Sequence, residues 1–325
     1  MRVSHRMIAQ SISRNIRHNL RSLQEKAVQL SSGRNFTRPS QDPVGAYKVM
    51  RISGTGMMRN EQHRRNIGEG ITWLTTAEDA IAEGLDALLR LKELAIYTAN
   101  GTMTEEDLQA ISPEIKQILD SMIGVGNSEV TGLYIFGGHQ SQAPPFKLEE
   151  EEGGTLKVVY KGDEGIREIE ITPEQTIPVN LTAEKVFGEL ITEGADEENN
   201  NNVESPVNLF QTIIDIYDIL TGNYDDGNGG DGRDKLGGEI LKQIDEHQNR
   251  LLQCVAEVGS RMGRLTYTEQ RLHNEHIYLR ELRSKIEDID LAEAITEVTM
   301  QENTYLAALS TGARMVYPSL VDFLR

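Results

Sequence analysis

Three side chains with metal-binding chemistry lie close together in the sequence. His273 and His276 are three residues apart, and Glu269 lies four residues before His273, so a helix would place them near one face. A zinc site needs at least three firm ligands, and a third one beside the two histidines is not apparent. We therefore expect exposed histidines at these positions and no metal site.

Two further short patterns could carry chemistry, and each occurs once. Residues 229–236 (GGDGRDKL) fit one copy of a calcium-binding repeat, but that fold needs several stacked copies to share ions and a core. We expect a flexible loop there instead. Asn180, Leu181 and Thr182 form a glycosylation triplet, a pattern for which chance matches are common.

The sequence does not indicate catalysis. It contains no nucleophile elbow, phosphate-binding loop or C-x-x-C pair. Cys254 is the single cysteine, so no intrachain disulfide can form, and its apolar neighbours predict a buried, inert thiol. We therefore predict that the protein is not an enzyme and takes no cofactor or metal.

Charge is distributed unevenly along the 325 residues, whose net charge is −18. Residues 1–65 carry 13 Lys/Arg and 3 Asp/Glu, whereas the remainder carries 20 and 48. A basic arm of this kind can bind nucleic acid or an anionic membrane, or it can face an acidic surface of the same protein or of a neighbour. We give the second interpretation the greater weight.

Composition favours long helices over a large compact core, because aromatic residues make up only 5% and charged residues 26% of the chain. Nowhere do eighteen apolar residues run together, and the first residues lack the apolar core of a signal peptide. We expect a soluble chain, whose export would use a route that removes no leader.

The longest helical pattern runs from about Leu236 to Val316 without a proline. Its apolar residues recur at steps of three and four, with a two-residue phase jump after Ile289. Such a stripe is too narrow to form a core alone and requires partner helices. The stripe comprises Leu272, Leu279, Leu282, Ile286 and Ile289, then Leu291, Ile295, Val298, Tyr305, Leu309 and Val316.

The first 32 residues show the same one-sided pattern, and Gly33 is placed to end their helix. The first helix is thus the obvious partner of the last. A second helix starts at Asp42-Pro43 and extends to Ala99, with an irregularity expected near residues 53–56. A further helix follows a T-x-x-D cap at Thr104, and Val130–Gly138 predicts a strand or hairpin.

Residues 144–205 predict a small β insertion. Leu156–Tyr160 and residues 166–171 alternate in polarity around a Gly-Asp-Glu-Gly loop, which predicts a β-hairpin, and Thr176–Leu181 predicts a third strand. Helical spacing returns after Pro206. The predicted fold class is therefore mainly α with a small β insertion, in which long antiparallel helices form a rod and a terminal coiled coil.

Four motifs at the two ends of the chain support a family resemblance by their order and placement. They are Gln29–Gly33 (QLSSG), Ser40–Ala46 (SQDPVGA), Ser284–Glu293 (SKIEDIDLAE) and Pro318–Leu324 (PSLVDFL). The first three resemble the flagellin superfamily, which has an LSSG turn, a DDPAG helix start and a C-terminal signature with two spaced aspartates. The matching residues are Leu30, Ser31, Ser32, Gly33, Asp42, Pro43, Asp288 and Asp290.

Within that superfamily the chain is more similar to the hook–filament junction proteins than to filament flagellins. Pro318–Leu324, Leu133–Gly138 (LYIFGG) and Leu74–Ala80 (LTTAEDA) carry this distinction. Two features depart from the family: Gln41 stands where an acid is common, and the insertion matches no motif. The resemblance implies a flagellin-like division into 1–42 with 290–325 (terminal coiled coil), 43–143 with 206–289 (helical rod) and 144–205 (outer β domain).

The resemblance implies a structural adaptor of the bacterial flagellum at the hook–filament junction. Its implied partners are other copies of itself, the hook-side junction protein FlgK, flagellin and a flagellar export chaperone, with no nucleic acid and no membrane. It also implies an extracellular location, reached through the flagellar type III channel without a cleaved signal peptide. The alternative is a coiled-coil protein that binds nucleic acid or a membrane surface through its basic N-terminal arm.

We predict that the terminal helices are largely disordered in the monomer and fold when their apolar stripes are buried between subunits. A coiled coil closed within one monomer is the other interpretation of the same pattern. One of Asp288 and Asp290 could pair with the basic face of residues 14–21, or both could be solvated. The predicted assembly residues are Ile8, Ile12, Leu20, Leu23, Leu30, Ile295, Val298, Leu309, Val316, Leu320, Phe323 and Leu324.

Overall fold

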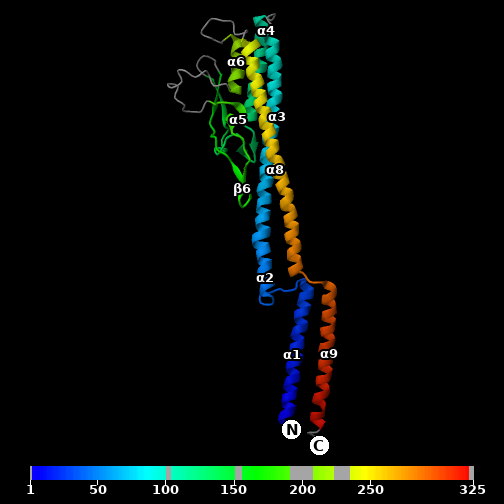
Figure 1. Cartoon of the computed structure of the whole chain (residues 1–325). Helices are drawn as coiled ribbons and strands as arrows, with labels where there is room; N and C mark the ends of the chain where they lie inside the picture. The colour runs from blue at the N-terminus through cyan, green and yellow to red at the C-terminus, as the bar shows by residue number, and fades with distance from the viewer. Residues whose placement is uncertain (1, 100–103, 151–155, 191–207, 223–234, 322–325) are drawn as a thin grey trace. The chain divides into compact units, whose positions relative to one another are not determined.

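The computed structural model describes residues 2–99, 104–150, 156–190, 208–222 and 235–321 (Figure 1). The chain divides into a terminal unit, residues 1–61 with 273–325, and a central unit, residues 62–272. The borders fall within α3 (Met58–Thr98) and α8 (Leu241–Glu287). The three-part division expected from the family resemblance remains a prediction.

The terminal unit is built on an antiparallel pair of helices, α1 (Arg2–Ser32) and α9 (Leu291–Val321), which lie side by side (Figure 1). Two contacts set their register. Lys26 Nζ lies 2.5 Å from Glu297 Oε2, and Gln301 Nε2 donates to the carbonyl of Asn19 at 3.5 Å. The predicted pairing of the first and last helices is confirmed.

The helix predicted from Asp42 begins as α2 (Pro43–Met50) and passes through a π-helical stretch, η1 (Arg51–Met57), into α3. Asp42 accepts a hydrogen bond from the Gly45 amide at 3.0 Å, and Pro43 occupies the first turn. The π-helical stretch covers the predicted irregularity at residues 53–56. A π turn accommodates extra residues, so the helix continues through it without a break.

The prediction of one unbroken helix from Leu236 to Val316 is wrong. A π-helical stretch η3 (Leu236–Ile240) leads into α8, and residues 288–290 separate α8 from α9. Asp290 Oδ1 accepts the amides of Ala292 at 2.9 Å and Glu293 at 3.3 Å, which starts a new helix. The phase jump in the apolar pattern marks this break.

The central unit packs α3, α8, α4 (Glu105–Gly126) and α6 (Leu209–Thr221) around one core. Thr104 and Asp107 form the predicted capping box at the start of α4. The Cys254 thiol is buried, as predicted, and donates to the Lys185 carbonyl at 3.6 Å. The core includes Ile67, Leu74, Ile81, Leu88, Ile115, Leu119, Met122, Phe210, Ile213, Ile244, Leu251, Val258 and Leu265.

The described β structure of the central unit consists of three antiparallel two-stranded pairs. The predicted hairpin of residues 156–160 with 166–171 is wrong, although the strands themselves exist. The pairs are β1 (Glu129–Val130) with β2 (Leu133–Tyr134), β3 (Phe146–Glu150) with β4 (Leu156–Tyr160), and β5 (Glu168–Thr172) with β6 (Gln175–Pro178).

Two interactions explain why β4 pairs with β3. Phe146, at the start of β3, packs in an aromatic cluster, with ring centroids 5.1 Å from Phe187 of α5 (Ala183–Phe187) and 4.9 Å from Phe210 of α6. The loop after β4 is held elsewhere, because Asp163 Oδ1 accepts the amides of His139 at 2.5 Å and Gly165 at 3.1 Å. It therefore cannot act as a hairpin turn between β4 and β5.

His247 is an almost fully buried side chain of α8 in the central unit. Its Nε2 lies 3.0 Å from Thr212 Oγ1 of α6. Burial, with the positive charge of Arg250 as a second cause, lowers the pKa of His247 from 6.5 to about 4. Between these values the unfolded chain binds a proton that the folded chain does not, so stability decreases as pH falls through this window.

We predict that His247→Gln loses part of the pH dependence of folding. Glutamine can still bond Thr212 but does not titrate, so the loss of unfolding free energy from pH 7 to pH 5 should shrink by about 1–2 kcal/mol. Urea unfolding at both pH values measures this. The matched control is His273→Gln, at an exposed histidine. Burial raises the pKa of Asp215 and of Asp218, so these carboxyls also contribute to the pH dependence of folding. Both are present in every variant, and their contribution therefore cancels in the comparison. An unchanged pH dependence in His247→Gln would contradict the prediction.

Candidate functional site: the helix connections and the terminal helix pair

The family-motif residues gather in the terminal unit, at the connections that join α1 to α2 and α8 to α9. Gly33 ends α1 with a φ of +68°, a left-handed conformation that glycine adopts without strain. The Asn35 amide donates to the Glu287 carbonyl at 2.7 Å, and the Ile289 amide donates to the Gly33 carbonyl at 3.1 Å. These antiparallel bonds join the two connections directly.

The motif side chains start and end helices. Ser31 and Ser32 donate to the carbonyls of Val28 at 3.1 Å and Gln29 at 3.2 Å in the last turn of α1. Asp42 caps α2 and Asp290 caps α9, as described above. Asp288 Oδ2 accepts the Ser284 hydroxyl at 2.6 Å in the last turn of α8. The motifs thus specify backbone turns and helix ends.

A buried carboxylate stabilises the connections, and the sequence analysis did not single it out. The Glu287 side chain is 11% exposed, and its oxygens lie 2.8 Å from Arg34 Nη1 and 3.5 Å from Arg283 Nε. The only signal in the sequence is its place beside Asp288 in the motif. The buried charge requires these partners, since an unpaired carboxylate would be strongly disfavoured there.

One of the two interpretations of Asp288 and Asp290, an ion pair with the basic face of residues 14–21, is not found among the described residues. Both aspartates bond within their own connection, as described above. The register explains this, because Lys26 faces Glu297 and Asn19 faces Gln301, so residues 14–21 lie opposite the middle of α9. Two of the basic side chains of the N-terminal arm, Lys26 and Arg34, do face acidic residues of the same unit.

The face of α9 that packs on α1 is composed largely of small and polar residues. Gly312 shows how close the helices are, because an added Cβ would lie 3.1 Å from Ile12 Cγ2 and 3.3 Å from Ile16 Cδ1. On α1 this seam holds the half-buried Ile12, Ile16, Leu20, Leu23 and Leu30. On α9 the buried and half-buried residues are Ala294, Val298, Gln301, Tyr305, Ala308 and Gly312.

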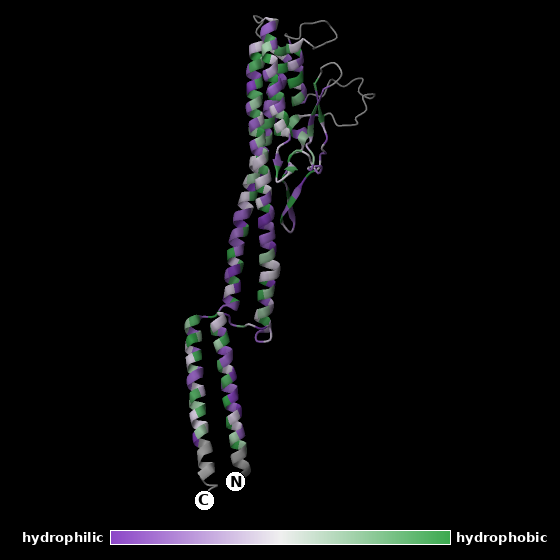
Figure 2. Cartoon of the chain, turned by 180° about the vertical axis from the view of Figure 1, so that it is seen from behind, coloured by the Kyte–Doolittle hydropathy of each residue, from purple (hydrophilic) through white to green (hydrophobic). Residues whose placement is uncertain are grey.

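Hydrophobic and hydrophilic residues alternate along α9 (Figure 2), and four of its leucine and isoleucine side chains are exposed outside this seam. We call Leu291, Ile295, Leu306 and Leu309 the outer stripe; they are 56%, 54%, 54% and 38% exposed. Their spacing of three, four and eleven residues places them on one side of the helix. An exposed apolar row of this length is a typical docking surface for another helix.

The predicted assembly residues therefore fall into three groups. Ile8, Ile295 and Leu309 are exposed. Ile12, Leu20, Leu23, Leu30 and Val298 are half-buried and belong to the seam between α1 and α9. Val316 and Leu320 lie in α9 with side chains outside the described part, and Phe323 and Leu324 lie outside the described residues altogether.

The other candidate chemistries have less support. In the described part of the chain, no three His, Cys, Asp or Glu side chains are grouped to hold a metal ion. Asn180 of the glycosylation triplet has a buried side chain, which accepts a hydrogen bond from the Arg167 amide at 2.9 Å and donates one to the Gly165 carbonyl at 2.7 Å. The calcium-type pattern at 229–236 lies mostly outside the described residues. None of the described helices has the length and apolarity to cross a membrane.

Two family models match the ends of the chain, and known flagellar proteins are similar to it along its length. The family model of the bacterial flagellin N-terminal helical region matches residues 3–141, and that of the C-terminal helical region matches residues 241–324. Flagellar hook-associated protein 3 of Salmonella typhimurium is 22% identical over 100% of both chains. The flagellin of Bacillus subtilis is 26% identical over 92% of this chain and 91% of its own.

A solved structure shows the same fold. The flagellar junction protein FlgL from Legionella pneumophila superposes with a TM-score of 0.56 at 16% identity, covering 75% of this chain and 100% of its own. With the two helical-region matches and the connections described above, the chain belongs to the flagellin superfamily. Within it, the full-length similarity to hook-associated protein 3 confirms the resemblance to the junction branch, FlgL. The chain shares the structural role of these flagellar proteins and is a component of the extracellular flagellum.

We predict that Arg34→Gln loosens the helix connections. Glu287 would keep one partner at 3.5 Å, and because Arg34 is itself largely exposed the loss should be about 1 kcal/mol. The amides of Asn35 and Ile289 should then exchange with deuterium roughly fivefold faster. The matched control is Arg38→Gln in the same connection, where no ion pair to a described residue is present. Equal exchange in the two variants would contradict the assigned role of Arg34.

Proposed function

We propose that this protein is a structural adaptor at the hook–filament junction, which polymerises through α1 and α9 and joins the hook-side junction protein to flagellin. The observation that carries this proposal is the outer stripe of α9. It places large apolar side chains in solvent, while the described α9 residues that are buried against α1 are Ala294 and Gly312. The stripe therefore offers a surface for helices of neighbouring copies and junction partners.

The energetics favour folding of the terminal pair within an assembly. Each ordered residue costs roughly 1–2 kcal/mol of backbone entropy, and full burial of a Leu or Ile side chain contributes ~1.5–3 kcal/mol. The large side chains of the seam, such as Ile12 and Leu20, are only half-buried, so the pair alone is marginal. Burial of the outer stripe and Ile8 by neighbours would add the missing contribution.

The proposal includes the route by which the protein reaches its site. An export chaperone would hold the chain, and the flagellar type III channel would pass it in extended form without cleavage of a signal peptide. A single cysteine supports this, because no intrachain disulfide would resist extension. Marginal terminal helices also favour an extended passage.

A junction role is favoured over that of a filament flagellin by two motifs. Pro318–Leu324 and Leu133–Gly138 are more similar to junction proteins, and the match to hook-associated protein 3 covers the entire chain. The remaining alternative is binding of nucleic acid or an anionic membrane by the exposed Arg14, Arg17 and Arg21. Salt-dependent retention on DNA or anionic vesicles would support that alternative.

We predict that the terminal helices of the monomer exchange their amide hydrogens readily and become protected on assembly. Hydrogen exchange followed by mass spectrometry, with the core of α3 as the internal reference, measures both states. Strong protection across Ile8–Leu30 and Ile295–Val316 in the monomer would show that the pair is already stable by itself. That result would contradict folding on assembly.

We predict that Ile295→Glu with Leu309→Glu abolishes incorporation at hook tips without changing the helix content of the monomer. Two carboxylates on the outer stripe would have to be buried without partners, which costs several kcal/mol. Labelled antibody on isolated hook–basal bodies measures incorporation. The matched control is Thr304→Glu with Thr311→Glu, at exposed positions on the opposite side of α9. Normal incorporation of the stripe variant would overturn the proposed interface.

A further inference from the structure

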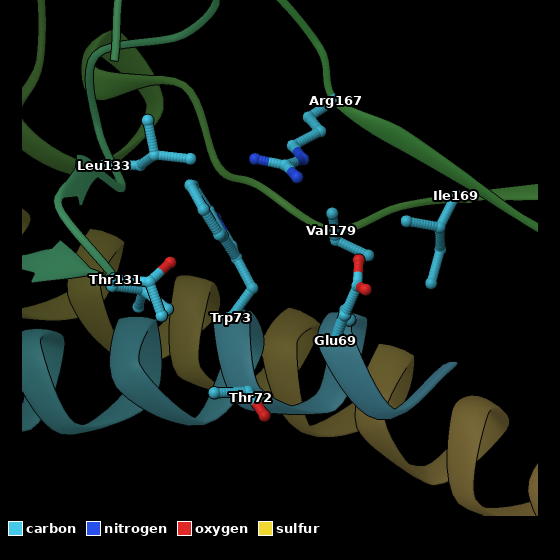
Figure 3. Close-up of a pocket in the computed structure, with 10 residues that line it drawn as sticks. Glu69, Thr72, Trp73, Thr131, Leu133, Arg167, Ile169 and Val179 are labelled. Carbon is cyan, nitrogen blue, oxygen red and sulfur yellow. The ribbon is translucent and has the colours of Figure 1, made fainter. Parts of the chain in front are cut away.

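A cavity of about 320 Å³ lies in the central unit (Figure 3). Its base is α3, with Glu69 and Trp73, and the β1–β2 hairpin contributes Leu133. Arg167, Ile169 of β5 and Val179 complete the wall. The volume is at the small end of the range for small-molecule sites, and most of the lining is apolar.

The wall of the cavity is fixed by close packing and hydrogen bonds. Gly70 allows the β structure to approach α3, because an added Cβ would lie 2.5 Å from Ile169 Cδ1 and 3.1 Å from Val179 Cγ1. The backbone amide of Arg167 is held by Asn180 Oδ1 at 2.9 Å. Arg261 Nη1 in turn donates to the Asn180 carbonyl at 2.8 Å. The backbone of Arg167 is therefore held in place before any ligand binds.

One buried hydrogen-bond donor of the cavity lacks an acceptor in the described part of the chain, and a guanidinium group lies beside it. Trp73 is 6% exposed, and its Nε1 has no hydrogen-bond partner among the described residues. The guanidinium carbon of Arg167 lies 4.6 Å from the Trp73 ring centroid, and none of the described carboxylates forms an ion pair with it. A buried N–H without an acceptor is unfavourable, so a ligand that supplies one is stabilised there.

These groups define the chemistry of a ligand. A carboxylate accepts from both a guanidinium and an indole N–H, and it neutralises the Arg167 charge. Leu133, Ile169 and Val179 offer contact to a short aliphatic chain. The Glu69 carboxylate also lines the cavity (Figure 3), and its negative charge opposes a phosphate dianion or a dicarboxylate more strongly than a monocarboxylate.

We propose that this cavity is a binding site for a small aliphatic monocarboxylate. The carboxylate lies against Arg167 and Trp73 Nε1, and the alkyl chain packs on Leu133, Ile169 and Val179. The site is independent of the assembly surface on α9, since each is formed within its own unit.

The test uses the full-length chain and the fact that Trp73 is its single tryptophan. The spectrum of the ¹⁵N-labelled protein therefore holds one indole N–H resonance, which reports the hydrogen bond of this atom directly. Hexanoate is the probe, and hexylamine is the matched probe with the same chain and the opposite charge. We expect saturable movement of the indole resonance with hexanoate at millimolar concentration and none with hexylamine.

Variants assign the anion contact. Arg167→Met keeps an unbranched side chain over Trp73 but removes the charge, and should weaken hexanoate binding about tenfold, as expected for loss of one charge-assisted contact. Arg51→Met is the control, since Arg51 lies 5.8 Å over the Tyr47 ring in the terminal unit. Failure of hexanoate to saturate, equal binding of hexylamine, or unchanged affinity in Arg167→Met would each overturn the proposal. The wild-type comparison of the two probes decides the matter even if a variant does not fold.

Discussion

The close approach of α1 and α9 is the contact on which the terminal unit depends. Gly312 permits it, since any larger residue there would press on Ile12 and Ile16 of α1. Close approach favours small residues such as Ala294 and Gly312 in the seam, and the leucine and isoleucine side chains of the outer stripe lie on another side of α9. One helix therefore has two functions: its small face closes the pair, and its large face is available to other molecules.

The connections at residues 33–42 and 288–290 make this pairing possible. They join α1 to α2 and α8 to α9, and they are held to each other by backbone bonds and by the Arg34–Glu287–Arg283 ion pairs. The residues that identify the superfamily, such as Gly33, Asp42 and Asp290, supply the turn and the two caps. The motifs thus specify a backbone turn and helix caps, and the surface proposed for assembly lies on the helices that these features orient.

Much of the fold could be predicted because its signals are local. Asp42-Pro43, the Thr104 capping box and Gly33 act within a few residues, and the structure has each feature where the sequence indicates it. The described strands pair with their neighbours along the chain, but the choice of neighbour depends on distant contacts: β4 pairs with β3, whose Phe146 packs on Phe187 and Phe210. The assembly site could be predicted only in part for a related reason: the periodic pattern of large residues does not reveal Ala294, Ala308 and Gly312, which belong to the seam.

The distribution of side-chain sizes on α9 argues for partners more strongly than the presence of an apolar stripe does. A helix pair that had to be stable alone would gain most by burying Leu291, Ile295, Leu306 and Leu309 against its partner, because buried area sets the hydrophobic contribution. Here these residues are exposed, while Ala294 and Gly312 are buried. The arrangement is unfavourable for an isolated pair and favourable for one surrounded by other helices. The terminal unit is therefore best understood as one part of a larger helical core.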